Sequence, residues 1–122
     1  MATIRDVVSK DLIQVDPKTT VAEAATVMGG KHVGSALVMD GDRLAGIFTE
    51  RDIVRALGEH FDAAGHPVEH WMTRNPTTIG PDASTEQALD SMLSGGFRHL
   101  PVVEKDRVVG MLSLRDIAAA TE

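Results

Sequence analysis

The 122-residue chain has no cysteine, no tyrosine and only one tryptophan. Without cysteine it can form neither a disulfide nor a thiolate metal site, and this composition fits a reducing compartment. The chain also lacks any apolar run near the roughly eighteen residues that a membrane helix needs. Its N-terminus carries charges where a signal peptide needs an apolar stretch. We therefore expect a cytoplasmic protein with no membrane association.

Excess positive charge is absent as well. The formal net charge is −6, because 18 acidic residues outnumber 12 lysines and arginines. That sign argues against binding a long nucleic-acid backbone, although a few local donors can still hold a small anion. The chain contains no cysteine nucleophile, no G-x-S-x-G elbow and no P-loop. We expect no catalytic residues and no enzyme activity.

What the chain does contain is an internal repeat. A shift of sixty-four positions aligns residues 4–57 with residues 68–121 without a gap, and eleven of the fifty-four aligned pairs are identical. The segment "GIFTERD" at 46–52 returns as "GMLSLRD" at 110–116. A unit of this length that occurs twice indicates two copies of one supersecondary design. We expect repeat 1 to span residues 1–60 and repeat 2 to span residues 68–122. Residues 61–67 are expected to be the linker between them.

Each copy predicts the element order β-α-β-β-α. An extended segment that ends at Pro17 or Pro81 is followed by a capping box, Thr20-x-x-Glu23 or Ser84-x-x-Gln87, which starts a helix. Glycine pairs are expected to end these helices, and a polar turn then joins two strands into a hairpin. A second helix begins in each "RDI" segment. The predicted ends are Gly29-Gly30 and Gly95-Gly96, and the predicted second helices cover 51–57 and 115–121.

Three segments together resemble the CBS-domain pair, also called a Bateman module. They are "GSALVMDGDRLAGIFTERDI" (34–53), "MTRNPTTIGPDASTEQALDSM" (72–92) and "RHLPVVEKDRVVGMLSLRDI" (98–117). The resemblance covers essentially the whole chain and implies an α+β fold of two tandem CBS repeats packed with pseudo-twofold symmetry. It also implies a homodimer that senses an adenosine-containing ligand between repeats, with AMP, ADP, ATP or S-adenosylmethionine as candidates and no required cofactor.

The repeated hydroxyl and acid have two interpretations. Thr49-x-x-Asp52 and Ser113-x-x-Asp116 are helix-capping patterns, and a cap stabilises a fold by about 1 kcal/mol without any ligand. A carboxylate at a helix start can also accept hydrogen bonds from the two ribose hydroxyls. The resemblance implies that the acids contact ribose and that the hydroxyls contact ribose or phosphate. The two roles are compatible.

Other candidates rest on the resemblance or on position. Arg51 and Arg115, in the first turn of each second helix, could neutralise phosphates or be solvated. Arg98 and His99 match a family position that reaches phosphates, whereas repeat 1 has glycine and serine there, which favours unequal sites. Five apolar residues could line a slot for the adenine ring, or could simply belong to the core: Val15, Val38, Ile79, Pro101 and Val102.

The histidines near the linker do not form a recognisable metal site. His60, His66 and His70 have no cysteine or carboxylate pattern to complete one, so we expect surface histidines and no metal. Trp71 is expected to pack where the halves or protomers meet. Two functions remain open. One is a regulatory module that binds an adenosine-containing nucleotide and signals through dimer packing to a downstream protein. The alternative is a ligand-free dimeric module for protein interaction.

Overall fold

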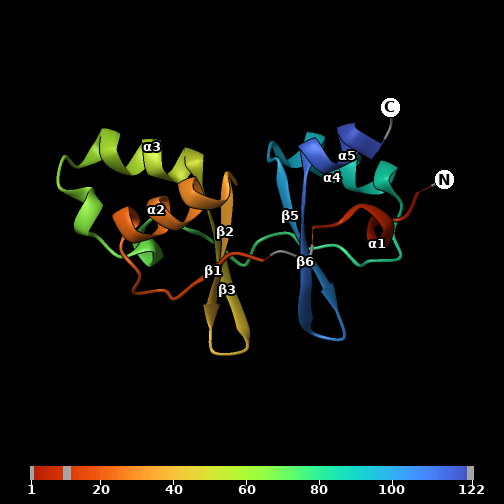
Figure 1. The fold of residues 1–122 in the computed structure, drawn as a ribbon, viewed down its shortest axis with the longest axis horizontal. Coiled ribbons are helices and arrows are strands. Elements are labelled where there is room, and N and C mark those ends of the chain that lie inside the picture. The colour runs from red at the N-terminus through yellow and green to blue at the C-terminus, as the bar shows by residue number, and fades with distance from the viewer. Residues whose placement is uncertain (1, 10–11, 121–122) are drawn as a thin grey trace. The chain divides into compact units, whose positions relative to one another are not determined.

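The computed structural model describes residues 2–9 and 12–120 (Figure 1). Its internal contacts group the chain into two compact units. One consists of 13–76, and the other combines 1–12 with 77–122. Helices and strands alternate within both units, which gives the α+β fold of two tandem repeats. The spatial division thus differs from the division of the sequence into repeats, because the first twelve residues group with the second repeat.

The unit 13–76 is a four-stranded sheet with its helices on one side. The sheet has the order β1-β2-β3-β4, with β1 parallel to β2 and the other neighbours antiparallel. In Figure 1, α2 and α3 lie side by side near the top of the β2–β3 hairpin. The elements are β1 (Gln14–Val15), α2 (Val21–Lys31), β2 (Ser35–Asp40), β3 (Arg43–Thr49), α3 (Glu50–Glu59), η1 (Ala63–Gly65), η2 (Val68–His70) and β4 (Thr73–Arg74).

The other unit repeats this design with fewer paired residues. Its described elements are α1 (Ile4–Val7), α4 (Thr85–Gly95), β5 (His99–Glu104), β6 (Arg107–Ser113) and α5 (Leu114–Ala120). Only β5 and β6 form a sheet here. The counterparts of β1 and β4 are single bridges, a parallel one from Ile79 to Val102 and an antiparallel one from Ser9 to Met111. The extended segments expected before each first helix are therefore a short strand in one copy and a bridge in the other.

The predicted helix starts are confirmed. The hydroxyl of Thr20 accepts a hydrogen bond from Glu23 N at 3.1 Å, and Ser84 does the same for Gln87 N at 3.1 Å. In both boxes the side chain of the third helical residue accepts a hydrogen bond from the backbone N–H of the capping residue. These side chains satisfy N–H groups that have no partner inside the helix.

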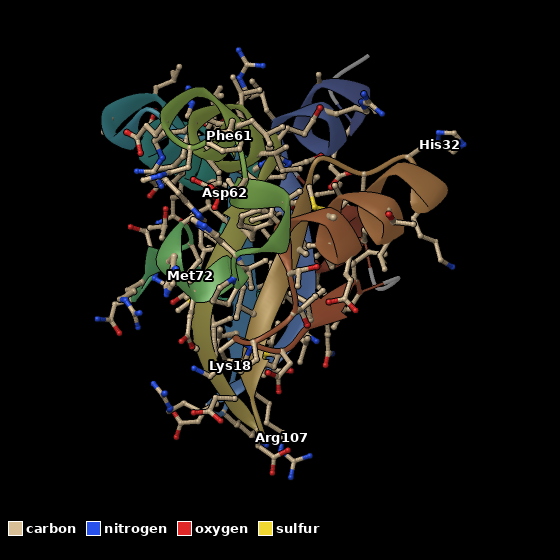
Figure 2. The ribbon with its side chains drawn as sticks, turned by 90° about the vertical axis from the view of Figure 1, so that its left-hand side faces the viewer. Lys18, His32, Phe61, Asp62, Met72 and Arg107 are labelled. Carbon is tan, nitrogen blue, oxygen red and sulfur yellow. The ribbon has the colours of Figure 1, made fainter. Side chains whose placement is uncertain are left out.

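The predicted helix ends are right in one copy and wrong in the other. Gly96 takes the left-handed conformation, with φ of 73°, directly after α4. Gly29 and Gly30, however, lie inside α2, and the left-handed residue that ends this helix is His32, with φ of 57°. His32 aligns with Gly96, so the end of the helix is equivalent in both copies although only one has glycine there. Figure 2 shows His32 at the outer end of α2, pointing away from it.

The segment expected to be a linker, 61–67, is folded. It contains the whole of η1 and Pro67, the residue that precedes η2, and Ala63 is completely buried in the core of the unit 13–76. The ring of Phe61, in contrast, is 96% exposed. Figure 2 shows Phe61 and Asp62 on the side of this unit that is turned toward the viewer.

The segment at the start of each repeat pairs with the unit built from the other repeat. Ile4 N donates to Ala83 O at 3.0 Å, and the aligned Val68 N donates to Thr19 O at 2.8 Å. Both apolar side chains are fully buried, Ile4 with Leu100 and Leu112, and Val68 in the core of the unit 13–76. The hydrophobic cores are thus completed by residues from the other copy of the repeat.

The glycines of the repeated motif make this exchange possible. Glycine inside a strand is typical of a bulge or a close backbone approach. The register of each hairpin shifts next to the pairs Val38–Gly46 and Val102–Gly110, and the backbone approach is close as well. A Cβ added at Gly46 would lie 2.6 Å from Thr73 O, and one added at Gly110 would lie 2.9 Å from Ser9 O. Thr73 and Ser9 are aligned residues that pair beside β3 and β6. Any side chain at either glycine would push the exchanged segment away.

Candidate functional site

The hydroxyl and the acid of the repeated motif meet at the start of the second helix in each unit. Thr49 N donates to Asp52 Oδ2 at 2.9 Å, and Asp52 N donates to Thr49 Oγ1 at 3.4 Å. Ser113 N donates to Asp116 Oδ2 at 2.9 Å, and Asp116 N donates to Ser113 Oγ at 3.1 Å. The capping interpretation of both motifs is confirmed, and one carboxylate oxygen of each acid is used by its cap.

The two acids differ in what surrounds the remaining oxygen. Asp52 is 5% exposed, and Arg55 Nη2 donates to its Oδ1 at 3.3 Å. The same nitrogen donates to Trp71 O at 2.6 Å, and the guanidinium lies 5.7 Å from the centroid of the Trp71 ring. Burial raises the pKa of Asp52 above its ordinary value of 3.8, although the hydrogen bonds from Thr49 and the charges of Arg55 and Arg51 oppose this rise.

Asp116 has no such neighbour. It is half-buried, and among residues 2–9 and 12–120 no lysine or arginine forms an ion pair with it. In the unit that contains Asp116, Ala119 stands at the position of Arg55, and Val7 stands at the position of Trp71. Among the described residues, no donor bonds to the second oxygen of Asp116, in contrast to that of Asp52. Arg55 was not among the residues predicted from the sequence, although the alanine at the aligned position 119 distinguishes the two copies.

The start of the hairpin lies beside each cap. In the unit 13–76, Glu50 N donates to Gly34 O at 3.0 Å, whereas in the other unit Leu114 N donates to Arg98 O at 2.9 Å. His99 is the antiparallel partner of Ser113. The structure thus brings four predicted residues, Arg98, His99, Ser113 and Asp116, to one end of the β5–β6 hairpin. The equivalent place in the unit 13–76 has glycine and serine before the cap, and no basic side chain from the hairpin start.

The two arginines of the first turn, Arg51 and Arg115, are exposed. The candidates for an adenine slot lie further along the strands, mostly in the cores. Val38, Pro101 and Val102 are fully buried, and Val15 is 9% exposed. Ile79 is partly buried and its backbone bonds to β5, with Ile79 N to Pro101 O at 3.1 Å. In this structure these side chains pack as core residues.

The histidines gather around the single tryptophan. Trp71 is 8% exposed and belongs to the core of the unit 13–76. The rings of His66 and Trp71 are stacked, with their centroids 6.4 Å apart. The ring of His60 meets that of Trp71 edge to face, with a centroid separation of 5.7 Å. The rings of His66 and His70 are 5.9 Å apart. Within the described part of the chain, no group of three histidines or acids is arranged to hold a metal ion.

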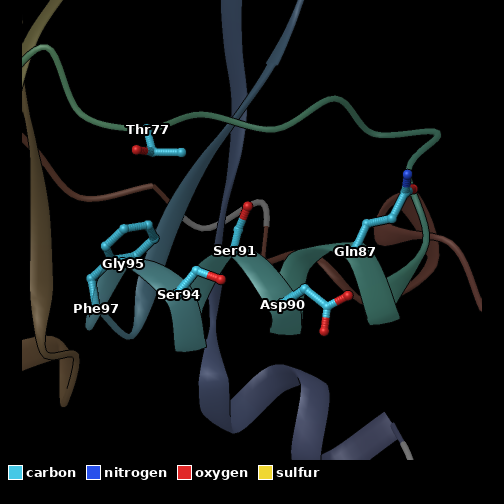
Figure 3. A pocket seen from close by; sticks show the side chains of 7 residues that line it. All are labelled: Thr77, Gln87, Asp90, Ser91, Ser94, Gly95 and Phe97. Carbon is cyan, nitrogen blue, oxygen red and sulfur yellow. The ribbon is translucent and has the colours of Figure 1, made fainter.

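A surface pocket of about 500 Å³ lies in the same unit as Asp116, away from the cap. Figure 3 shows it between α4 and the segment that carries Thr77, with the side chains of Gln87 and Ser91 directed toward that segment. The lining is mainly hydroxyl and amide groups, with one carboxylate and one aromatic ring: Thr77, Gln87, Asp90, Ser91, Ser94, Gly95 and Phe97. None of these residues was predicted from the sequence as a ligand contact, and none of the predicted ligand contacts lines this pocket.

Comparison with known proteins identifies the family. The model of the CBS domain matches the chain twice, over residues 4–59 and 68–122. The chain therefore belongs to the CBS-domain family and carries two copies of the domain. No helix among the described residues is both long enough and apolar enough to span a membrane.

Relatives of different lengths share this pair of domains. An uncharacterized 17.7 kDa protein of Acidianus ambivalens is 39% identical over 123 residues, which cover 98% of this chain and 74% of that protein. The meiotically up-regulated gene 70 protein of Schizosaccharomyces pombe is also 39% identical, over 116 residues, but the match covers only 16% of its length. In several relatives, therefore, the chain corresponds to about a fifth or less of a longer protein.

Solved structures show the same fold. A CBS-domain containing protein from Agrobacterium tumefaciens has a TM-score of 0.95 and 30% identity, covering 99% of this chain and all of the other. The CBS domain pair of protein MJ0100, solved with 5′-methylthioadenosine and S-adenosyl-L-methionine, has a TM-score of 0.91 and 27% identity, covering 99% of this chain and 96% of that one. CBSX2, solved with AMP, has a TM-score of 0.86 and 25% identity, covering 99% of this chain and 96% of that one.

Proposed function

We propose that this chain is a regulatory module that binds an adenosine-containing ligand, with Asp116 accepting hydrogen bonds from the ribose hydroxyls. The observation that carries the proposal is the state of Asp116. One of its oxygens is held by the cap at 2.9 Å, while the acid is half-buried and has no ion-pair partner among the described residues. A carboxylate fixed in this way keeps acceptor capacity for a diol.

The residues around Asp116 suit the rest of such a ligand. The hydroxyl of Ser113 accepts from the helix and can still donate its own proton to a ribose or phosphate oxygen. Arg98, His99 and Arg115 stand at the same end of the hairpin and helix and supply donors for a phosphate. The adenosine compounds bound by the MJ0100 pair and by CBSX2 support this ligand class.

The regulatory part of the proposal concerns a partner protein. We propose that the chain forms a homodimer and that ligand binding changes how the dimer engages a downstream protein, without catalysis by the module itself. A ligand can shift such an equilibrium only if it has different affinities for the two states. The observable consequence is that the partner's affinity depends on AMP or S-adenosylmethionine concentration.

Isothermal titration with AMP and with S-adenosylmethionine tests the ligand proposal. Asp116→Asn keeps an oxygen for the cap but removes the charge, and we expect affinity to fall about 10- to 150-fold, the range for losing hydrogen bonds to a charged group. Asp90→Asn is the matched control, since Asp90 lines the pocket beside α4. Unchanged affinity in Asp116→Asn contradicts the proposal, and loss of binding in Asp90→Asn alone assigns the ligand to that pocket.

A second candidate function is supported by the surface of α3. Val54 is 72% exposed, Leu57 49% and Phe61, which follows the helix, 96%. An apolar face of this kind is typical of a contact surface for another protein. A module that uses only this face would bind its partner equally well with and without nucleotide, which co-purification in the presence and absence of AMP measures.

A further inference from the structure

We propose that Arg55 closes the carboxylate of the first repeat, so that the wild-type chain takes one adenosine-containing ligand, at Asp116, and not two. This inference rests on the proposed function and deepens it. It assigns to Arg55 a positioning and inhibitory role that the aligned copy of the repeat lacks.

The carboxylate of Asp52 has both oxygens engaged. Oδ2 accepts from Thr49 N at 2.9 Å and from Thr49 Oγ1 at 3.2 Å, and Oδ1 accepts from Arg55 Nη2 at 3.3 Å. The side chain of Asp52 is only 8% exposed. A diol that approached this acid would have to displace a cationic donor. The bond between two oppositely charged groups includes a Coulombic attraction that a neutral hydroxyl donor cannot supply.

Arg55 is itself held in place by Trp71. The nitrogen that contacts Asp52 also donates to Trp71 O at 2.6 Å, and the guanidinium carbon lies 5.7 Å from the centre of the indole ring. This separation is within the range for an attraction between a cation and an aromatic face. Because a guanidinium does not lose its proton in proteins, ordinary changes of pH leave this contact in place.

The second repeat cannot form the same contact. Ala119 and Val7 occupy the positions of Arg55 and Trp71, so neither the cation nor the ring is present. The cap itself is alike in both copies, with the acid accepting from the backbone N–H at 2.9 Å. The difference between the two acids therefore lies in the residue three positions later, one turn further along the helix.

The first test counts AMP molecules per chain by isothermal titration. Wild type is expected to bind one AMP, Arg55→Met two, and the double variant Arg55→Met/Asp116→Asn one. Arg43→Met is the matched control, because Arg43 forms an exposed i,i+3 pair with Asp40 at the same 3.3 Å. Two sites in wild type, one of them lost in Asp52→Asn, overturn the inference, as does a single site in folded Arg55→Met.

The second test builds the contact into the other repeat. Ala119 is exposed, so Ala119→Arg places a guanidinium three residues after Asp116 without disturbing the core. We expect AMP affinity to fall about tenfold or more. Ala118→Arg is the control, since residues two apart do not face each other on a helix. Equal affinities in the two variants contradict a closing role for an arginine at this position.

These outcomes separate the inference from the function on which it rests. If wild type binds no AMP but Arg55→Met does, the assignment to Asp116 fails and the closing role of Arg55 stands. If wild type binds AMP through Asp116 and Arg55→Met gains no site, the inference alone fails. If neither protein binds AMP or S-adenosylmethionine, both are wrong, because releasing Asp52 has not produced a diol site.

Discussion

The two segments that begin the repeats form the same contacts in different units, but with opposite charges. Arg5 contacts Asp82 at 3.2 Å in one unit, and the aligned Glu69 contacts Lys18 at 2.7 Å in the other. Acid and base have changed places between the two pairs. If each segment packed on its own repeat, Arg5 would face Lys18 and Glu69 would face Asp82. The charges therefore favour the exchanged arrangement and oppose the direct one, which is selection against an alternative fold as well as for this one.

The apolar contacts do not discriminate in this way. Ile4 and Val68 are both aliphatic and both fully buried, so either would fit an apolar site of this kind. Exposed ion pairs contribute only about 0.2–1 kcal/mol each, far less than a buried aliphatic side chain. Burial therefore supplies most of the stability of the exchanged arrangement. The weaker ion pairs favour that arrangement over the one in which each segment packs on its own repeat.

The largest effect is expected from Ile4→Ala. Ile4 belongs to the first repeat by sequence but is fully buried with Leu100 and Leu112. Truncation of such a side chain destabilises a fold by about 2–5 kcal/mol. Urea denaturation measures the loss, and amide hydrogen exchange should locate it in residues 77–120. Faster exchange confined to 13–60 would contradict the exchanged contact.

The next effect separates the two motif glycines. Gly46→Ala and Gly110→Ala both place a methyl group against backbone, 2.6 Å from Thr73 O and 2.9 Å from Ser9 O. Overpacking typically costs about 1–3 kcal/mol. We expect Gly46→Ala to be the more destabilising because its contact with the backbone is shorter, whereas the atom nearest to the group added at Gly110 is Cγ2 of the Val8 side chain. The denaturation midpoint is the measurement. Gly30→Ala is the control, since nothing lies within 4 Å of that added methyl group and it should stabilise the helix.

A smaller effect tests the direction given by charge. Glu69→Lys places a cation opposite Lys18, and we expect a loss of about 0.2–1 kcal/mol at low salt. Adding Lys18→Glu restores opposite charges and should recover most of that loss. A double-mutant cycle with no coupling between the two positions would show that the reversed charges do not select the arrangement.

The smallest expected effect concerns two capping acids of the same unit, which should change the stability of the fold in opposite directions as the pH rises. The pKa of exposed Glu23 lies below its ordinary 4.5, chiefly because Thr20 N donates to it, so its contribution to stability is lost as the pH falls. The pKa of buried Asp52 lies above its ordinary 3.8, so its ionisation reduces stability as the pH rises. As the pH rises from 3 to 6, we expect the stability of Glu23→Gln to fall relative to that of wild type. Over the same range we expect the stability of Asp52→Asn to rise relative to that of wild type. Parallel trends in the urea midpoints would be inconsistent with the difference in burial.

Contacts between near neighbours were predictable from the sequence, and distant ones were not. The capping boxes at Thr20 and Ser84 depend on residues three apart, so their pattern suffices to place the helix starts. The end of α2 at His32 was missed because the left-handed residue that ends a helix was expected to be glycine. The alignment of His32 with Gly96 nevertheless marked the position. Arg55 was missed although Asp52 is only three residues away, because its other partner, Trp71 O, lies sixteen residues away. The assignment of Asp116 to a ribose remains a prediction.

The sequence by itself determined the duplication, the order of elements in each copy and the family, because these follow from periodicity, local hydrogen bonding and aligned motifs. Only the tertiary structure decided which unit each opening segment completes, and which of the two acids is paired with an arginine. Both depend on residues that are distant in the chain or on one side chain's surroundings. Burial and charge pairing set these contacts, and neither is encoded in any single stretch of the sequence.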